Sequence, residues 1–145
     1  MSSLEDRRWA GRSHPWCVYT RLAAALALIV AITTHRSLGV QALIPIGVCL
    51  FFIIINPFIF PAPKDKTRWA TRSVLGQRLW RRRENPGWDV PSISRVASAL
   101  AYFVALWLAF ENQLAEAVLL GLIALGLKLV YLDWMARYHR RAQTA

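Results

Sequence analysis

Lys128 is the residue whose type and position most clearly suggest chemistry, because it is a charged side chain inside a long apolar run. An ionisable residue within a membrane span is a candidate for binding a ligand or a proton. Alternatively, its long side chain reaches the nearer headgroups. Asp133 lies too far round the helix to pair with Lys128 and is better placed to pair with Arg137, four residues on. We expect an intramembrane charge cluster, structural or functional, formed by Arg21, Arg95, Lys128 and Asp133.

A second candidate site is the basic segment 61–92, which combines arginines with tryptophans. On a helix over 66–83, Trp69, Ser73, Gly76 and Trp80 share one face. Tryptophan facing lipid with arginine reaching headgroups is typical of an interfacial helix, and each basic residue attracts anionic lipid by about 1 kcal/mol. The simpler interpretation is a basic loop without a specific ligand. The candidate lipid- or partner-binding residues are Arg68, Trp69, Arg72, Arg78, Trp80, Arg81, Arg82 and Arg83.

The sequence does not predict a catalytic or metal site. His14, His35 and His139 are far apart along the chain, and no spacing of ligands typical of zinc or haem occurs. Cys17 and Cys49 are expected at different depths and therefore as free thiols. No triad order, phosphate loop or carboxylate pair stands out, so we expect no cofactor and favour a protein that is not an enzyme.

Four apolar runs must position these residues. They cover about 16–34, 38–60, 93–110 and 114–136, and each has roughly 18–23 residues, which suffices to cross a hydrocarbon core of about 30 Å as a helix. Three-residue turns join the first two runs and the last two. The sequence therefore predicts one all-α membrane domain over 1–145, with two antiparallel hairpins joined by the basic segment. Ser92 is the expected N-cap of the third span.

The charges predict how the four spans are oriented. Of the 18 Lys and Arg residues, 16 lie in the two tails or between Lys64 and Arg95, and only Arg36 lies at an outer turn. Cytoplasmic loops are rich in such residues, so both termini and the middle segment are expected in the cytoplasm. The net charge of +10 has the same explanation. Without a recognition motif, it does not indicate nucleic-acid binding.

The first and third spans contain a similar stretch, 20–27 and 94–101, which indicates either a tandem duplication or the chance similarity of apolar helices. Both stretches start rows of small residues at every fourth position, such as Ala23, Ala27 and Ala31. Such rows allow another helix to approach closely. They predict tight packing in the bundle, with a site between the first and third spans as the alternative.

Four pieces of the sequence resemble a family of small four-span membrane proteins of bacteria and archaea, known as a domain of unknown function. The pieces are 14–21 (HPWCVYTR), 56–63 (NPFIFPAP), 69–80 with Trp69-Ala70 and Val74 to Trp80, and 128–135 with Lys128 and Leu132 to Met135. Gln77 stands where the family pattern has an acid. The resemblance implies a multi-pass protein of the bacterial inner membrane and carries no established activity.

Three functions are compatible with these residues. The first is a structural or accessory protein that binds anionic phospholipid or docks on other membrane protein subunits through its basic segment. The second is a small carrier or channel that uses Lys128, although the spans offer few other polar residues. The third is a membrane enzyme acting on a lipid phosphate, which Arg72, Arg78 and Arg81 would hold.

Overall fold

The computed structural model describes residues 3–82 and 89–144, with side chains from Arg7 onward. The described residues form helices and their connections, without strands. The helices are α1 (Ser3–Arg12), α2 (Pro15–Thr33), α3 (His35–Leu38), a 3-10 turn η1 (Gly39–Ala42), α4 (Leu43–Ile59), α5 (Trp69–Arg81), α6 (Val90–Phe110) and α7 (Leu114–Thr144).

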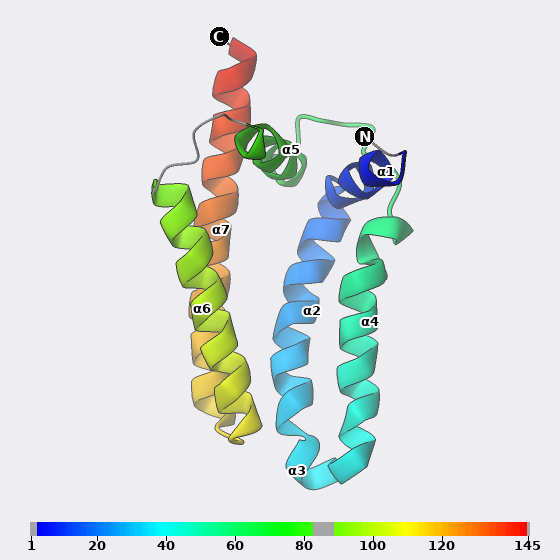
Figure 1. Ribbon diagram of the computed structural model, residues 1–145, viewed down its shortest axis with the longest axis vertical. Coiled ribbons are helices and arrows are strands. Elements are labelled where there is room, and N and C mark those ends of the chain that lie inside the picture. Colours follow the sequence, from blue (N-terminus) through cyan, green and yellow to red (C-terminus); the bar gives the residue numbers. More distant parts are fainter. Residues whose placement is uncertain (1–2, 83–88, 145) are drawn as a thin grey trace.

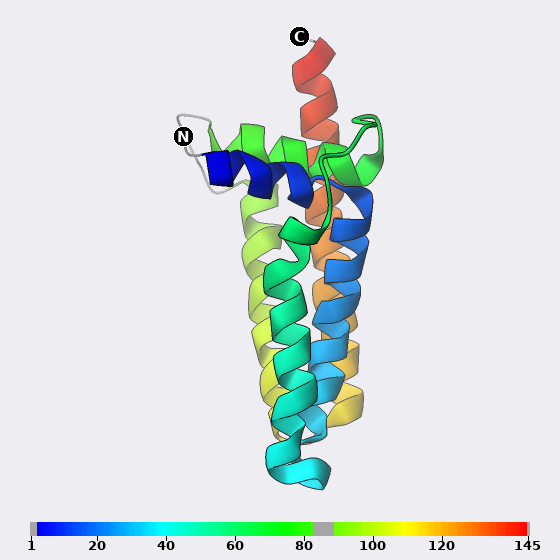
Figure 2. The same ribbon diagram turned by 90° about the vertical axis from the view of Figure 1, so that its right-hand side faces the viewer.

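Four helical stretches are long and apolar enough to cross a membrane: Pro15–Thr33, His35–Ile59, Val90–Phe110 and Leu114–Thr144. In Figures 1 and 2, α2 lies beside α4 and α6 lies beside α7, so the chain forms two hairpins. Both hairpin turns lie at one end of the bundle, here called the turn end. Both described chain ends, α1 and α5 lie at the other, here called the basic end (Figure 1). The predicted all-α, four-span fold is therefore confirmed.

The N-terminus of α6 differs from the expectation that Ser92 is the N-cap. Asp89 takes that position, with an extended backbone, and its carboxylate accepts hydrogen bonds from the backbone N–H of Ser92 at 3.2 Å and from its hydroxyl at 2.8 Å. Pro91 then falls in the first turn, where a missing N–H leaves no hydrogen bond unmade. The helix therefore begins three residues before the apolar run, at a capping residue that hydropathy does not reveal.

Replacing Asp89 with alanine is expected to lower the free energy of unfolding by about 1 kcal/mol, because the N-cap acceptor is lost. Equilibrium unfolding in detergent micelles measures this change. Asp89→Asn is the matched control, since asparagine is an equally good N-cap. Equal losses in both variants would show that the carboxylate charge, rather than capping, stabilises the protein here.

Small residues form the tightest contact between long helices, as predicted, and α6 and α7 make it. Ala105 and Ala109 of α6 and Ala117 of α7 are fully buried, together with Ile29 of α2. The row in α2 behaves differently, because Ala31 is buried whereas Ala23 and Ala27 are exposed. The prediction that this row packs against another helix was therefore wrong for Ala23 and Ala27 and confirmed for Ala31.

The two short helices α1 and α5 lie across the basic end of the bundle (Figure 2). Each precedes a hairpin in the chain and packs on the second long helix of that hairpin, α1 on α4 and α5 on α7. A glycine makes each contact possible. A Cβ at Gly11 would overlap the backbone of Pro57, and a Cβ at Gly76 would overlap the backbone of Met135. The same order of elements thus occurs twice, as expected for a tandem duplication.

Candidate functional site

A partly open cavity of about 670 Å³ lies between the two hairpins. Its volume falls within the range of about 300–1,000 Å³ that is typical of small-molecule sites. Most of the lining is apolar and comes from α2, α6 and α7, whereas α4 contributes only two side chains to it. The residues of this apolar part include Leu22, Ala25, Leu26, Leu50, Ile53, Ala99, Leu106 and Leu125.

The cavity extends over half of the bundle. On α6 its lining runs from Arg95 to Leu106, a length of about 16 Å at the helical rise per residue. Toward the turn end it is followed by the packed cluster around Ile29, whose side chain contacts Gly121. Tyr102 also joins the hairpins by donating a hydrogen bond to the carbonyl oxygen of Ala25 at 2.8 Å. The deep end of the cavity is therefore held shut by contacts between the hairpins.

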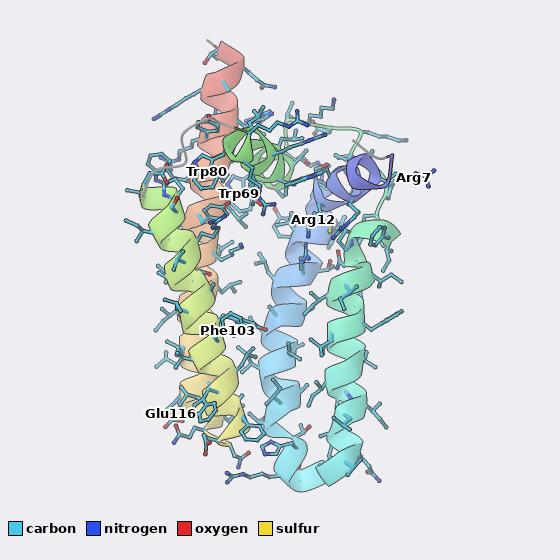
Figure 3. The ribbon with its side chains drawn as sticks, in the orientation of Figure 1. Arg7, Arg12, Trp69, Trp80, Phe103 and Glu116 are labelled. Atoms are coloured by element: carbon cyan, nitrogen blue, oxygen red, sulfur yellow. The ribbon has the colours of Figure 1, made fainter. Side chains whose placement is uncertain are left out.

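The end of the cavity nearest the basic end is lined by five cationic side chains, here called the cationic mouth. No carboxylate is among the described residues that line the cavity. Figure 3 shows Arg12 near the start of α2, far from Glu116 at the turn end. The mouth takes cations from five helices, and its members are Arg12, Arg21, Arg81, Arg95 and Lys128.

The cations of the mouth are close enough to repel one another. Burial, followed by the charges of Arg21, Arg8 and Arg81, lowers the pKa of Arg12 below its ordinary value. Its Nε atom is buried and meets no hydrogen-bond acceptor among the described residues. The ammonium group of Lys128 is repelled by the positive charges of Arg21, Arg95 and Arg81. Positive charge without a counter-charge at a partly buried site favours the binding of an anion.

Aromatic rings contact four of these cations, and one of the contacts places Nζ of Lys128 5.0 Å from the ring centroid of Tyr131. Trp9 of α1 lies between Arg12 and Arg81, whose Cζ atoms are 5.7 and 5.4 Å from its ring centroid. Arg95 lies over the ring of Trp80, at 5.6 Å. Cation–π contacts of this kind are worth about 0.5–2 kcal/mol each. Trp9 thus connects α1 to α5 above the cavity and orients two guanidinium groups.

The predicted intramembrane cluster is brought together only in part. Arg21, Arg95 and Lys128 meet at the mouth, whereas Asp133 belongs to another surface. Its carboxylate pairs with Arg137 at 2.7 Å, as predicted, and accepts a hydrogen bond from Nε1 of Trp69 at 3.1 Å. The alternative pairing of Asp133 with Arg21 or Arg95 is absent from the described contacts.

The basic segment forms a helix within the expected bounds, and most of its tryptophan face is buried in the protein, although Trp69 is half-buried. Ser73, Gly76 and Trp80 are buried against α7 or its neighbours, and Trp80 is 6% exposed. In Figure 3, Trp80 lies where α5 meets the α6–α7 hairpin. The expectation that Trp80 anchors α5 in lipid was therefore wrong, because the chain supplies the apolar partner itself.

The arginines of the segment separate into three groups. Arg81 reaches the cationic mouth. Arg68 and Arg82 are exposed, whereas Arg72 and Arg78 are half-buried. Nε of Arg68 lies 3.6 Å from a carboxylate oxygen of Asp65. Arg83 lies outside the described residues. Only one of the predicted lipid-binding arginines of this segment therefore lines the cavity.

Arg12 of the mouth and Trp9, which contacts it, were not predicted as site residues, because the N-terminus was interpreted as a tail. The signal was present but short. The segment 8–12 contains basic, aromatic and small residues, namely Arg8, Trp9, Gly11 and Arg12. The same combination predicted the helix that became α5. Tyr102, whose hydroxyl group joins the two hairpins within an apolar run, was also not predicted.

Comparison with known proteins gives one match. A family model described as a family of unknown function (DUF6653) matches residues 1–140. No curated protein and no solved structure matches the chain. The expected resemblance to a domain of unknown function is confirmed. Because the family description names no activity, the role of the protein is inferred from the geometry of the cavity.

Proposed function

The chain belongs to DUF6653, a family of unknown function, and from its structure we propose that it is a membrane protein that binds an anionic lipid between its two hairpins. The headgroup lies at the cationic mouth, and a hydrocarbon chain fills the apolar cavity below it. The observation that carries the proposal is the pairing of an apolar cavity with five cations, without a carboxylate among the described lining residues.

Electrostatics supports an anionic headgroup. Charged groups near the membrane core are costly unless they are paired or hydrated. Two described acids are paired outside the cavity, Asp133 with Arg137 and Asp65 with Arg68. Guanidinium groups bind phosphate with two parallel hydrogen bonds, and the buried Nε of Arg12 is a donor without an acceptor. A phosphate at the mouth would neutralise several of these cations together.

The shape of the cavity supports a lipid tail. Its lining below the mouth consists mainly of Leu, Ile and Ala side chains, and the hydroxyl groups of Ser98 and Tyr102 there already donate to backbone carbonyl oxygens. Burying a hydrocarbon chain there contributes about 0.8 kcal/mol for each CH₂ removed from water. The gain is smaller for a chain taken from the bilayer, so the headgroup contacts decide which lipid is selected.

We place the basic end in the cytoplasm of a bacterial inner membrane, with both termini on that side, because loop cations concentrate there. The bound lipid would then come from the cytoplasmic leaflet. Exposed cations of the middle segment, such as Lys66 and Arg82, would attract further anionic phospholipid to the same surface.

Holding a lipid is favoured over the alternatives. A carrier or channel needs a route to the turn end, and the cluster around Ile29 fills that half of the bundle. An enzyme would need a base to activate a nucleophile near the phosphate. The described lining residues include Cys17 and Ser98 but neither a carboxylate nor an imidazole that would activate them. Docking on other membrane protein subunits stays a prediction, and a lipid-holding accessory subunit would combine both roles.

Arg21→Gln is expected to reduce the amount of anionic lipid that co-purifies with the full-length protein by about tenfold or more. Loss of a hydrogen bond to a charged group costs about 1.5–3 kcal/mol. Native mass spectrometry of the protein released from mild detergent measures the bound lipid. The matched control is Arg140→Gln, which removes an exposed arginine of α7 outside the cavity lining. Retention of only neutral lipids, or equal retention by both variants, would contradict the proposal.

A further inference from the structure

We propose that the lipid held between the hairpins carries a terminal phosphate, as in lysophosphatidic or phosphatidic acid, with one acyl chain in the cavity. This inference rests on the proposed function and specifies its ligand. It selects a phosphomonoester over the phosphodiester headgroups of common anionic phospholipids.

The charge at the mouth distinguishes these headgroups. Five cations face the site, and the described lining residues supply no negative charge. A phosphodiester carries one negative charge, whereas a phosphomonoester carries about 1.5–2 at neutral pH and presents three terminal oxygens as acceptors. The cations come from five helices, so they approach the mouth from different directions. Three free oxygens can accept from several of them together, whereas a diester has two.

The depth of the cavity distinguishes the tails. Its length of about 16 Å corresponds to half of a hydrocarbon core of about 30 Å. A glycerolipid in its normal orientation has its headgroup at the membrane surface and its chain ends near the midplane of the bilayer. The cavity matches this arrangement, because it begins at Arg21 and Arg95 and ends before Ile29. A long polyprenyl phosphate would extend past the closed end. Tyr102 and Leu106 thus limit the ligand to a chain of one leaflet.

Binding of matched lysolipids to the purified full-length protein tests the inference. The probes are lysophosphatidic acid, lysophosphatidylglycerol and lysophosphatidylcholine with the same acyl chain, titrated by native mass spectrometry or calorimetry in mild detergent. We expect lysophosphatidic acid to bind at least tenfold more tightly than lysophosphatidylglycerol at pH 8. Phosphatidic acid is the second arm, and it should bind comparably if its second chain lies outside the cavity.

The preference should shrink to about twofold or less at pH 5, because the second phosphate proton binds with a pKa of about 6. The titratable groups of the protein that face the headgroup are the five cations of the mouth and the thiol of Cys17 beside Arg12 and Arg21. Tyr102 lies further along the lining, and α4 contributes only Leu50 and Ile53. Lysophosphatidylglycerol meets the same groups, so its own pH dependence serves as the reference. Only the difference between the two ligands reports the phosphate.

The outcomes separate the two proposals. Equal affinity for lysophosphatidic acid and lysophosphatidylglycerol, or a preference independent of pH, overturns the phosphomonoester and leaves anionic lipid binding in place. Equal affinity for lysophosphatidylcholine overturns the proposed function as well. Glycerol 3-phosphate competing as strongly as the lipid would show a site for the soluble headgroup, and it would overturn the role of the acyl chain.

Discussion

Replacing Gly76 with alanine is expected to detach α5 from α7 and to lower the free energy of unfolding by about 2 kcal/mol or more. A Cβ at this position overlaps the backbone of Met135, which cannot move aside as a flexible side chain could. Overpacking costs about 1–3 kcal/mol even where side chains can adjust. The loss would appear although alanine is a better helix former than glycine by about 1 kcal/mol.

Two measurements check this expectation in the full-length protein. Equilibrium unfolding in detergent gives the stability, and tryptic cleavage after Arg78 and Arg81 reports the release of α5. Gly126→Ala is the control, because no atom lies within 4 Å of a Cβ at Gly126. That variant should be as stable as the wild type or slightly more stable. If Gly76→Ala were equally stable and protected, α5 would not pack on α7 through this face.

Replacing Ala99 with tryptophan is expected to remove the bound lipid, with a loss of at least tenfold in affinity, while the fold is kept. Ala99 lines the cavity and is exposed within it, so a larger side chain has open space to enter. A tryptophan buries about 150–250 Å² of surface and would occupy the path of the acyl chain. The cationic mouth would be unchanged, so the variant tests the tail separately from the headgroup.

The control for this variant is Ala23→Trp. Ala23 is an equally exposed alanine of another long helix, but it does not line the cavity. Lipid bound per protein, measured as for Arg21→Gln, should be normal in this control. Normal lipid binding by Ala99→Trp would place the acyl chain elsewhere, against the outer surface of the bundle. Unfolding curves of both variants establish that a loss of lipid is not a loss of fold.

The sequence predicted the four spans and their pairing because these depend on local features, namely long apolar runs and turns too short for anything but antiparallel neighbours. The direction of each side chain was harder to predict. Residues five apart on a helix lie about 140° apart around its axis, so Lys128 and Asp133 at neighbouring depths face different surfaces. Lys128 accordingly faces the cavity, whereas Asp133 faces Trp69 and Arg137.

The face of α5 shows a different limit. An apolar stripe that contains Trp69, Gly76 and Trp80 is equally suited to lipid and to a neighbouring helix, because both are apolar. Gly76 indicated that the partner is a helix, since only another helix, and not lipid, requires a glycine for close approach of its backbone. A site between the first and third spans was only the alternative prediction, and the cavity does lie beside α2 and α6. Its size was not predictable, because it depends on how two separately formed hairpins stand relative to each other.

The position of the short helices has a consequence for biosynthesis. Each short helix docks on the second long helix of the hairpin that follows it. Gly11 of α1 can therefore pack on Pro57 only after α4 has been made and inserted, and Gly76 of α5 can pack on Met135 only after α7 has been. At a synthesis rate of about 5–20 residues per second, each short helix waits several seconds for its partner. The ribosome therefore finishes the membrane-inserted part of the chain before Arg12 and Arg81 can meet at Trp9. The lipid site is completed last, and a lipid already present between the hairpins would be enclosed as it closes.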